Sequence, residues 1–182
     1  MNKEVFSYIM PSIKNRSLKY VDGKKDFNFR LEMARIQAEK EPVDQEVIIR
    51  YVNEFLEMLG MEVVENPRVE VRGGETHRIN YSSITTRLTN KDDIVWIKFT
   101  DDNFISVIGT SRDIYFSEKA KNNTSSGIIN QKLNKDWDEK EVLIFPLINI
   151  PDGLYRSDVE CGIGNYLISK GVPILDYYSH IY

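Results

Sequence analysis

The stretch that decides the fold is residues 42–60, which read PVDQEVIIRYVNEFLEMLG. Its apolar side chains recur at the spacing of one buried helical face. They are Val43, Val47, Ile48, Tyr51, Val52, Phe55, Leu56 and Leu59. Pro42 suits a first helical turn, and Gly60 suits the position just past the end of a helix. The segment therefore predicts an amphipathic helix that covers a core.

Beyond this helix the apolar pattern changes to a period of two, which is typical of strands. The alternation predicts strands at 61–64, 68–72, 76–81, 94–99 and 104–108. Gly73-Gly74 is typical of a two-residue hairpin turn, and residues 101–103 indicate another turn. We expect an antiparallel meander of about five strands.

Two weaker helices are expected before residue 42. Residues 2–10 form a short amphipathic segment, with Val5, Phe6 and Ile9 on one side and Pro11 as its end. Asp26 is a suitable N-cap for a helix that runs to about residue 40. Its expected inward residues are Phe27, Leu31, Ala34 and either Ile36 or Ala38.

The C-terminal third alternates between strand and helix patterns. Residues 124–133 predict a helix capped by Thr124 or Ser125, and residues 142–150 predict a strand that Pro146 places at an edge or a bulge. Ser157 and Glu160 fit the capping box of a helix that ends at Gly171. Residues 173–178 then predict a last strand. The crossover is long enough for a parallel β-α-β unit.

These elements predict a single α+β domain over residues 1–182, in which N-terminal helices pack on an antiparallel β-meander and a C-terminal β-α-β unit follows. We expect residues 1–60 to be mainly helical, 61–109 to form the meander and 110–182 to mix both. A chain of this length can bury a sizeable core without disulfides or metal.

Composition excludes several classes of protein. The 182 residues include one cysteine and two histidines, too few for an internal disulfide or the usual four-ligand Cys/His zinc site. The chain has no apolar run long enough to span a membrane and no secretory signal pattern at its start. We expect a soluble cytoplasmic protein without a cofactor. The 21 Ile, 14 Lys and 14 Asn residues against three Ala indicate a low-GC genome, such as a bacterium, a phage or a mobile element.

Two weak catalytic sets can be built from the sequence. Cys161 lies in the first turns of a predicted helix, where the helix dipole lowers a thiol pKa, and His180 lies near Asp176 on the next element. Asp93 and Lys98 flank the meander, as a metal-dependent nuclease would require of a carboxylate and a lysine. A Glu two positions before Lys98 is lacking, because Trp96 stands there.

A possible anion site follows the strand that ends near residue 108. Thr110, Ser111 and Arg112 offer hydroxyls, backbone amides and a guanidinium, which together could cradle a phosphate. The simpler interpretation is a turn in which Ser111 caps a helix.

Charge is unevenly distributed along the chain, although the net charge is only -4. Residues 1–35 hold eight basic and four acidic residues, whereas residues 36–71 hold three basic and nine acidic ones. A charged partner could use the basic start, and the aromatic C-terminus is typical of contact surfaces. The candidate partner-binding residues are Lys14, Arg16, Lys19, Lys24, Lys25, Tyr177, Tyr178 and Tyr182.

The sequence favours a non-catalytic protein-binding module, a regulator or inhibitor of host machinery of the anti-defence or anti-CRISPR type. The alternative is a metal-dependent nuclease or another phosphate-ester hydrolase. A protein partner is expected. Nucleic acid could be reached through that partner or through the basic N-terminal segment, although the acidic total disfavours direct binding. The oligomeric state is left open.

Overall fold

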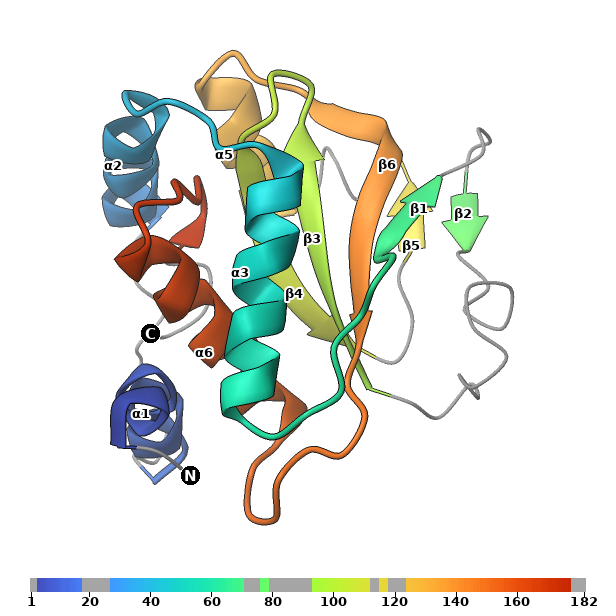
Figure 1. The fold of residues 1–182 in the computed structure, drawn as a ribbon. Helices are drawn as coiled ribbons and strands as arrows, with labels where there is room; N and C mark the ends of the chain where they lie inside the picture. The colour runs from blue at the N-terminus through green and yellow to red at the C-terminus, as the bar shows by residue number, and fades with distance from the viewer. Residues whose placement is uncertain are drawn as a thin grey trace.

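The computed structural model describes residues 3–17, 27–70, 76–78, 93–111, 115–117 and 124–177. Its helices are α1 (Lys3–Ser17), α2 (Phe27–Ala38), α3 (Gln45–Met58), α5 (Ser125–Lys132) and α6 (Arg156–Ser169). Its strands are β1 (Arg68–Glu70), β2 (Thr76–Arg78), β3 (Ile94–Thr100), β4 (Ile105–Ser111), β5 (Tyr115–Ser117) and β6 (Trp137–Pro146). The α+β class is confirmed, with helices at the N-terminal end and an antiparallel sheet (Figure 1).

The main sheet has four strands in the order β1-β6-β3-β4, and every pair of neighbours is antiparallel. The predicted meander is therefore wrong beyond the β3–β4 hairpin, which is confirmed. The hairpin expected at Gly73-Gly74 is also wrong, because β1 pairs with β6 while β2 pairs with β5 in a separate two-stranded sheet. Alternation of side chains fixes which face of a strand is buried but does not choose its neighbour.

Residues 61–64, which the alternation predicted as a strand, form no strand. Instead, the side chain of Asn53 on α3 forms hydrogen bonds with both backbone groups of Val64. Its Nδ2 donates to the Val64 carbonyl at 2.9 Å, and its Oδ1 accepts the Val64 N–H at 2.9 Å. A side-chain amide thus satisfies the groups that a neighbouring strand would otherwise pair.

Strand β6 lies in the interior of the sheet, so the edge position predicted from Pro146 is wrong. The alternative of a bulge at Pro146 is wrong as well, because the irregularity in the β3–β6 pairing lies between Lys98 and Thr100. Pro146 is tolerated because it is the last residue of β6, opposite Ile94, and β1 has ended before it, at the pair of Arg68 with Leu143. Loss of its N–H therefore removes no interior ladder bond. A strand buried on both faces also explains the continuous apolar run at 142–145.

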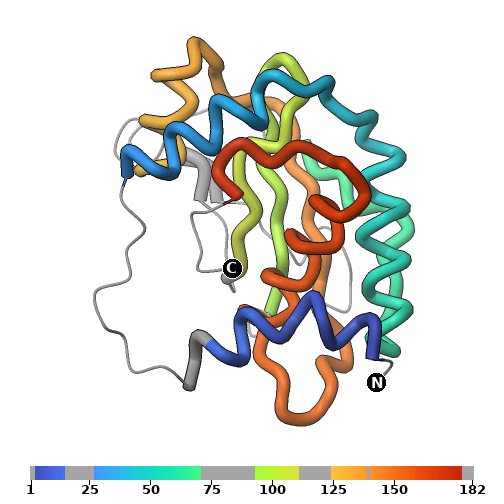
Figure 2. The backbone as a smooth tube through the Cα atoms, turned by 90° about the vertical axis from the view of Figure 1, so that its left-hand side faces the viewer, coloured from blue at the N-terminus to red at the C-terminus, as the bar shows by residue number. Residues whose placement is uncertain are grey.

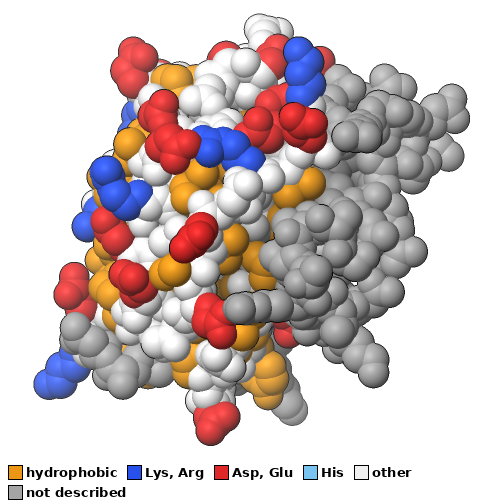
Figure 3. All heavy atoms as spheres, turned by 45° about the vertical axis from the view of Figure 1, so that its right-hand side comes forward, with side chains coloured by type: hydrophobic (Ala, Val, Ile, Leu, Met, Phe, Trp, Pro, Cys, Tyr) orange, Lys and Arg blue, Asp and Glu red, His pale blue; other side chains and the backbone are white. Residues whose placement is uncertain are grey.

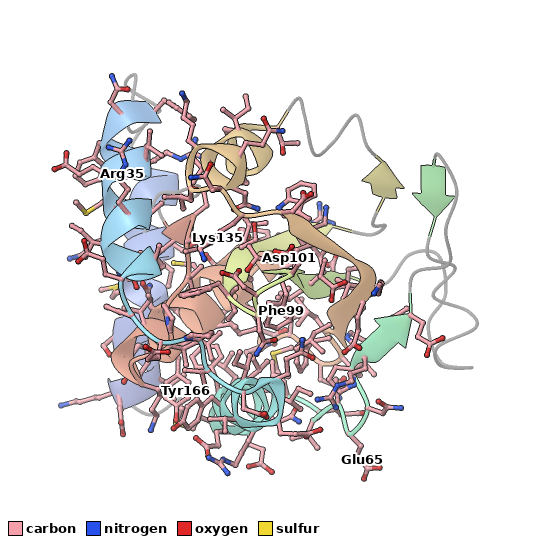
Figure 4. The ribbon with its side chains drawn as sticks, turned by 90° about the horizontal axis from the view of Figure 1, so that it is seen from above. Arg35, Glu65, Phe99, Asp101, Lys135 and Tyr166 are labelled. Atoms are coloured by element: carbon pink, nitrogen blue, oxygen red, sulfur yellow. The ribbon has the colours of Figure 1, made fainter. Side chains whose placement is uncertain are left out.

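Helices α3 and α6 cover one face of the main sheet, and α1 packs across α6 on their outer side (Figures 1 and 2). The core between them includes Val5, Ile9, Ile48, Val52, Phe55, Leu56, Val95, Ile97, Phe99, Leu143, Phe145, Val159, Ile163 and Leu167. In Figure 4 Phe99 lies in this interior and Tyr166 lies beside α3. Gly162 allows the helices to approach closely, because a Cβ there would lie 2.3 Å from Phe55 Cζ.

Helix α1 runs through Pro11 to Ser17, so the expected end at Pro11 is wrong. Val5, Ile9 and Ser12 form one buried face across the proline. This tertiary burial outweighs the backbone hydrogen bond that a proline removes from a helix interior. Phe6 was expected on the same side but is 36% exposed.

The start of α6 differs from the predicted cap. The N-cap is Tyr155, whose N–H donates to Asp158 Oδ2 at 2.7 Å, rather than Ser157 paired with Glu160. Asp158 is fully buried, and its Oδ1 accepts the Ser12 hydroxyl at 2.6 Å. The cap therefore also joins α6 to α1. The predicted end at Gly171 is confirmed by its φ of +81°, which favours glycine.

The expected final strand is reduced to a single parallel bridge between Ile174 and Ile105 of β4. The N–H of Leu175 donates to the Ile105 carbonyl at 2.9 Å, and that of Asp176 donates to the Ser106 carbonyl at 3.0 Å. Since β4 and β6 both run antiparallel to β3, this segment runs parallel to β6. It places Asp176 at the β4 edge of the sheet.

Helices α2 and α5 lie together at one end of the molecule (Figures 1 and 2). The N-cap of α5 is Thr124, one of the two predicted residues, and its side chain accepts the N–H of Gly127 at 3.1 Å. On α2, Leu31 and Ala34 are buried as predicted. Ile36, which was one of two expected inward residues, is instead 46% exposed.

Candidate functional site

Helix α2 carries apolar side chains on two opposite faces. Its inner face, which includes Leu31 and Ala34, packs against Ile129 and Leu133 of α5. Its other apolar residues are Phe29, Met33 and Ile36, and their spacing of four and three places them within about 60° of arc on the opposite side. We call these three residues the outer stripe.

The outer stripe is accessible on the surface. Phe29 is 42% exposed and Ile36 is 46% exposed, while Met33 is half-buried between them. Exposed Glu32 and Arg35 flank the stripe, and Figure 4 shows Arg35 on the outer side of α2. The stripe was missed in the sequence because a single inward face was expected; a second i, i+4, i+7 series was the available signal.

A buried ion pair fixes the orientation of α2. Arg30 on α2 donates from Nε to Asp176 Oδ1 at 3.1 Å and from Nη2 to Asp176 Oδ2 at 2.7 Å. Asp176 Oδ2 also accepts the Ser126 hydroxyl at 2.5 Å, and Arg30 Nη2 donates to Ser125 Oγ at 3.0 Å. The two charged side chains are 13% and 0% exposed. This bidentate geometry is the strong form of an Arg–carboxylate contact.

Asp93 and Lys98 do not converge on a common site. Asp93 pairs with Arg156 at the start of α6, at 2.7 Å. Lys98 is five positions further along an extended chain, which separates the two by roughly 16 Å and directs them to opposite faces of the sheet. Among the residues that the structure describes, no three His, Cys, Asp or Glu side chains are grouped so as to hold a metal ion.

Lys98 is a buried cation on the sheet face opposite α3 and α6. Its Nζ lies 4.4 Å from the ring centroid of Trp137 and 5.0 Å from that of Trp96. Two aromatic faces stabilise a cation that has lost its water. Burial nevertheless lowers the pKa of Lys98 to about 8.

The environment of Cys161 contradicts the expected thiolate. The side chain is buried, and this burial, followed by the nearby carboxylates Glu160 and Asp158, raises its pKa to about 12. The thiol accepts a contact from Asn165 Nδ2 at 3.4 Å. Asp176, the carboxylate of the expected Cys161–His180–Asp176 arrangement, accepts hydrogen bonds from Arg30 instead. His180 lies outside the described residues.

Residues 109–111 belong to strand β4, so the expected turn is wrong. Thr110 Oγ1 donates to the Ile94 carbonyl at 2.7 Å. The ring of Trp96 covers Gly109 so closely that a Cβ there would lie 2.1 Å from Trp96 Cζ2. The side chain of Ser111 and all of Arg112 lie outside the described part, and anion binding at 110–112 stays a prediction.

The candidate partner-binding residues fall mostly beyond what the structure describes. Lys14 is exposed on α1, and Arg16 belongs to α1 without a described side chain. Tyr177 is half-buried, and its hydroxyl donates to Asn165 Oδ1 within the fold. The remaining candidates outside the described residues are Lys19, Lys24, Lys25, Tyr178 and Tyr182.

The surface around α3 and β1 is of mixed charge. Figure 3 shows acidic side chains scattered over this face with basic ones between them. Arg68 bridges two of the acids, Glu46 at 2.6 Å and Glu141 at 3.2 Å. Exposed pairs of this kind indicate a solvated face.

No described helix is both long enough and apolar enough to cross a bilayer. Comparison of the chain with protein-family models, with curated proteins and with solved structures finds no significant match.

Proposed function

We propose that this chain is a non-catalytic protein-binding module and that the outer stripe of α2 is its contact surface. The observation that carries the proposal is that α2 has apolar residues on two opposite faces, and that the face opposite Leu31 and Ala34 is exposed at both ends of the stripe. Phe29 and Ile36, two large apolar side chains about two helical turns apart, are both exposed. Grouped exposed apolar side chains are typical of interaction surfaces.

The spacing of the stripe favours one recognition mode. Anchors at i, i+4 and i+7 are those of a helix laid into an apolar groove. Glu32 and Arg35 beside the anchors supply the polar rim that such an interface usually has. The expected occupant is therefore a partner protein that presents an apolar groove to α2.

A second copy of this chain is the weaker candidate for the occupant. Two convex helices touch along a line, and three part-exposed side chains supply on the order of 200 Å² per protomer. A stable interface needs about 800 Å² per partner. A groove contacts the flanks of α2 as well and so can reach this area.

The amino-acid composition of the chain suggests the kind of partner protein. The Ile-, Lys- and Asn-rich, Ala-poor usage indicates a low-GC bacterium, phage or mobile element. Small proteins of such origin frequently regulate or inhibit host machinery, including its defence systems. We propose a host protein of this kind as the partner, and an inhibitory or regulatory outcome.

The first experiment compares two matched double variants in capture from a low-GC bacterial lysate, with nuclease treatment in parallel. Phe29→Ser with Ile36→Ser removes the anchors of the stripe. Phe6→Ser with Val63→Ser changes two other exposed apolar residues, 36% and 43% exposed. A protein that binds the wild type and the control, but not the stripe variant, supports the proposal.

Recovery of the same protein by the stripe variant would contradict it, as would capture that disappears on nuclease treatment. A photo-crosslinking residue at position 36 then identifies the contact directly. Phosphodiesterase activity that is lost in Asp93→Ala or Lys98→Ala at unchanged stability would instead favour the hydrolase alternative.

A further inference from the structure

Helix α2 is attached to the rest of the fold partly through a buried ion pair with the C-terminal segment. Besides the small α2–α5 core, the pair of Arg30 with Asp176 attaches α2 to the fold through side chains that are 13% and 0% exposed. The two residues are 146 positions apart, so the C-terminal segment, rather than a sequence neighbour, holds the helix. The same carboxylate accepts Ser126 on α5.

Helix α3, which follows α2 in the chain, has its own contacts with the main sheet. Gln45 Nε2 at the start of α3 donates to Asn103 Oδ1 in the β3–β4 turn at 3.2 Å. Asn103 Nδ2 also donates to the Val43 carbonyl at 3.4 Å. Release of α2 from the body of the fold therefore leaves α3 and the main core in place.

We propose that Arg30 and Asp176 form a clamp through which the C-terminal segment controls whether α2 is docked, and that α2 opens while the main core stays folded. Helix α5 stays with the core, because Asn130 Nδ2 donates to Ser106 Oγ of β4 at 2.7 Å and both residues are buried. Any effect of this opening on partner binding rests on the proposed function, in which the outer stripe of α2 is the contact surface. The opening itself is a property of the free protein. Elements held by few buried contacts are those that open below the global unfolding free energy.

The geometry explains why one carboxylate controls the docking. Three donors converge on Asp176, namely Arg30 Nε, Arg30 Nη2 and Ser126 Oγ. In Asp176→Asn, one carboxylate oxygen becomes an NH₂ group that faces these donors. The guanidinium, 13% exposed, then lies beside a neutral side chain with too few acceptors.

The clamp is tested by native-state hydrogen exchange on the free protein. In Asp176→Asn, we expect amide exchange in α2 to accelerate at least about tenfold relative to wild type, with α3, α5 and α6 changing much less. The matched control is Asp93→Asn. It breaks a pair of the same 2.7 Å length with Arg156, whose side chains are 38% and 32% exposed, and should leave exchange in α2 unchanged.

Equal acceleration in all helices, or none in α2, would overturn the clamp. Where Asp176→Asn does not fold, wild-type exchange at low urea decides the question: α2 amides that exchange only together with α6 amides overturn it, and α2 amides with a separate, lower opening support it. Because no partner is present, failure of the clamp leaves the binding proposal standing. Loss of the lysate partner leaves the clamp standing.

Discussion

At the scale of single residues, the structure assigns structural roles to side chains that looked chemically suggestive. Cys161 is a buried thiol with a raised pKa, and Asp93 is half of a part-exposed ion pair. Gly109 is a position where any larger residue meets the ring of Trp96. The burial of Cys161, the pairing of Asp93 with Arg156 and the contact of Gly109 with Trp96 depend on tertiary packing, which is why composition and spacing did not show them.

Gly109→Ala should destabilise the fold by about 1–3 kcal/mol, because a Cβ would lie 2.1 Å from Trp96 Cζ2 and the ring must move. Urea denaturation followed by far-UV circular dichroism measures the change. In a Trp96→Leu background the same substitution should cost clearly less. An equal cost in both backgrounds would show that the ring is not the cause.

At the scale of elements, helix periodicity was a better guide than cap residues. Helix α3 begins after Asp44, whose carboxylate accepts the Glu46 N–H, so the expected first turn at Pro42 is wrong. Most of the predicted face is nevertheless buried, namely Ile48, Val52, Phe55, Leu56 and Leu59. Thr124 caps α5 as one of the two expected residues. At the start of α6, by contrast, Ser157 and Glu160 resembled a capping box, yet Asp158 accepts the Tyr155 N–H. Cap patterns recur by chance within a few residues, so only the backbone path decides which carboxylate is used.

Asp158→Ala should cost about 1–3 kcal/mol of stability, because it leaves the buried Ser12 hydroxyl without its acceptor and removes the acceptor of the Tyr155 N–H at the start of α6. Ser157→Ala, which removes the exposed side chain of the expected cap, should cost under about 0.5 kcal/mol. Thermal unfolding of the two variants side by side measures the difference. A larger loss in Ser157→Ala would return the cap to the residue that the sequence favoured.

At the scale of the whole molecule, the sheet order separates what local patterns encode from what packing selects. The β3–β4 hairpin follows from two apolar runs around a short turn, whose Asn103 has a φ of 69°. The insertion of β6 between β1 and β3 follows from no local signal. It gives the buried apolar run at 142–145 a hydrogen-bonded strand on either side.

The contribution of Lys98 should make global stability rise with pH between about 8 and 10.5. Its pKa is about 8 in the folded protein against 10.5 as its ordinary value. Between these values the unfolded chain binds more protons, so stability increases with pH, by about 1 kcal/mol from pH 8 to pH 9. The raised pKa of Cys161 has the opposite sign and lowers stability above about pH 9.

Lys98→Met isolates the lysine, because Cys161 titrates in both proteins. The free energy of unfolding of wild type minus that of Lys98→Met, from urea denaturation at several pH values, should rise from pH 7.5 to 9. A flat difference would mean that the amine is hydrated in the folded state, against the burial between Trp96 and Trp137.

The sequence by itself determined the α+β class, helix α3 and most of its buried face, the β3–β4 hairpin, the cap of α5 as one of two residues and the end of α6 at Gly171. Each depends on periodicity or turn chemistry within about twenty residues, where chain connectivity already brings the groups together. Only the tertiary structure decided the strand order, the passage of α1 through Pro11 and the outward turn of Phe29, Met33 and Ile36. These outcomes depend on contacts such as Arg30 with Asp176, across 146 positions, which no local pattern specifies.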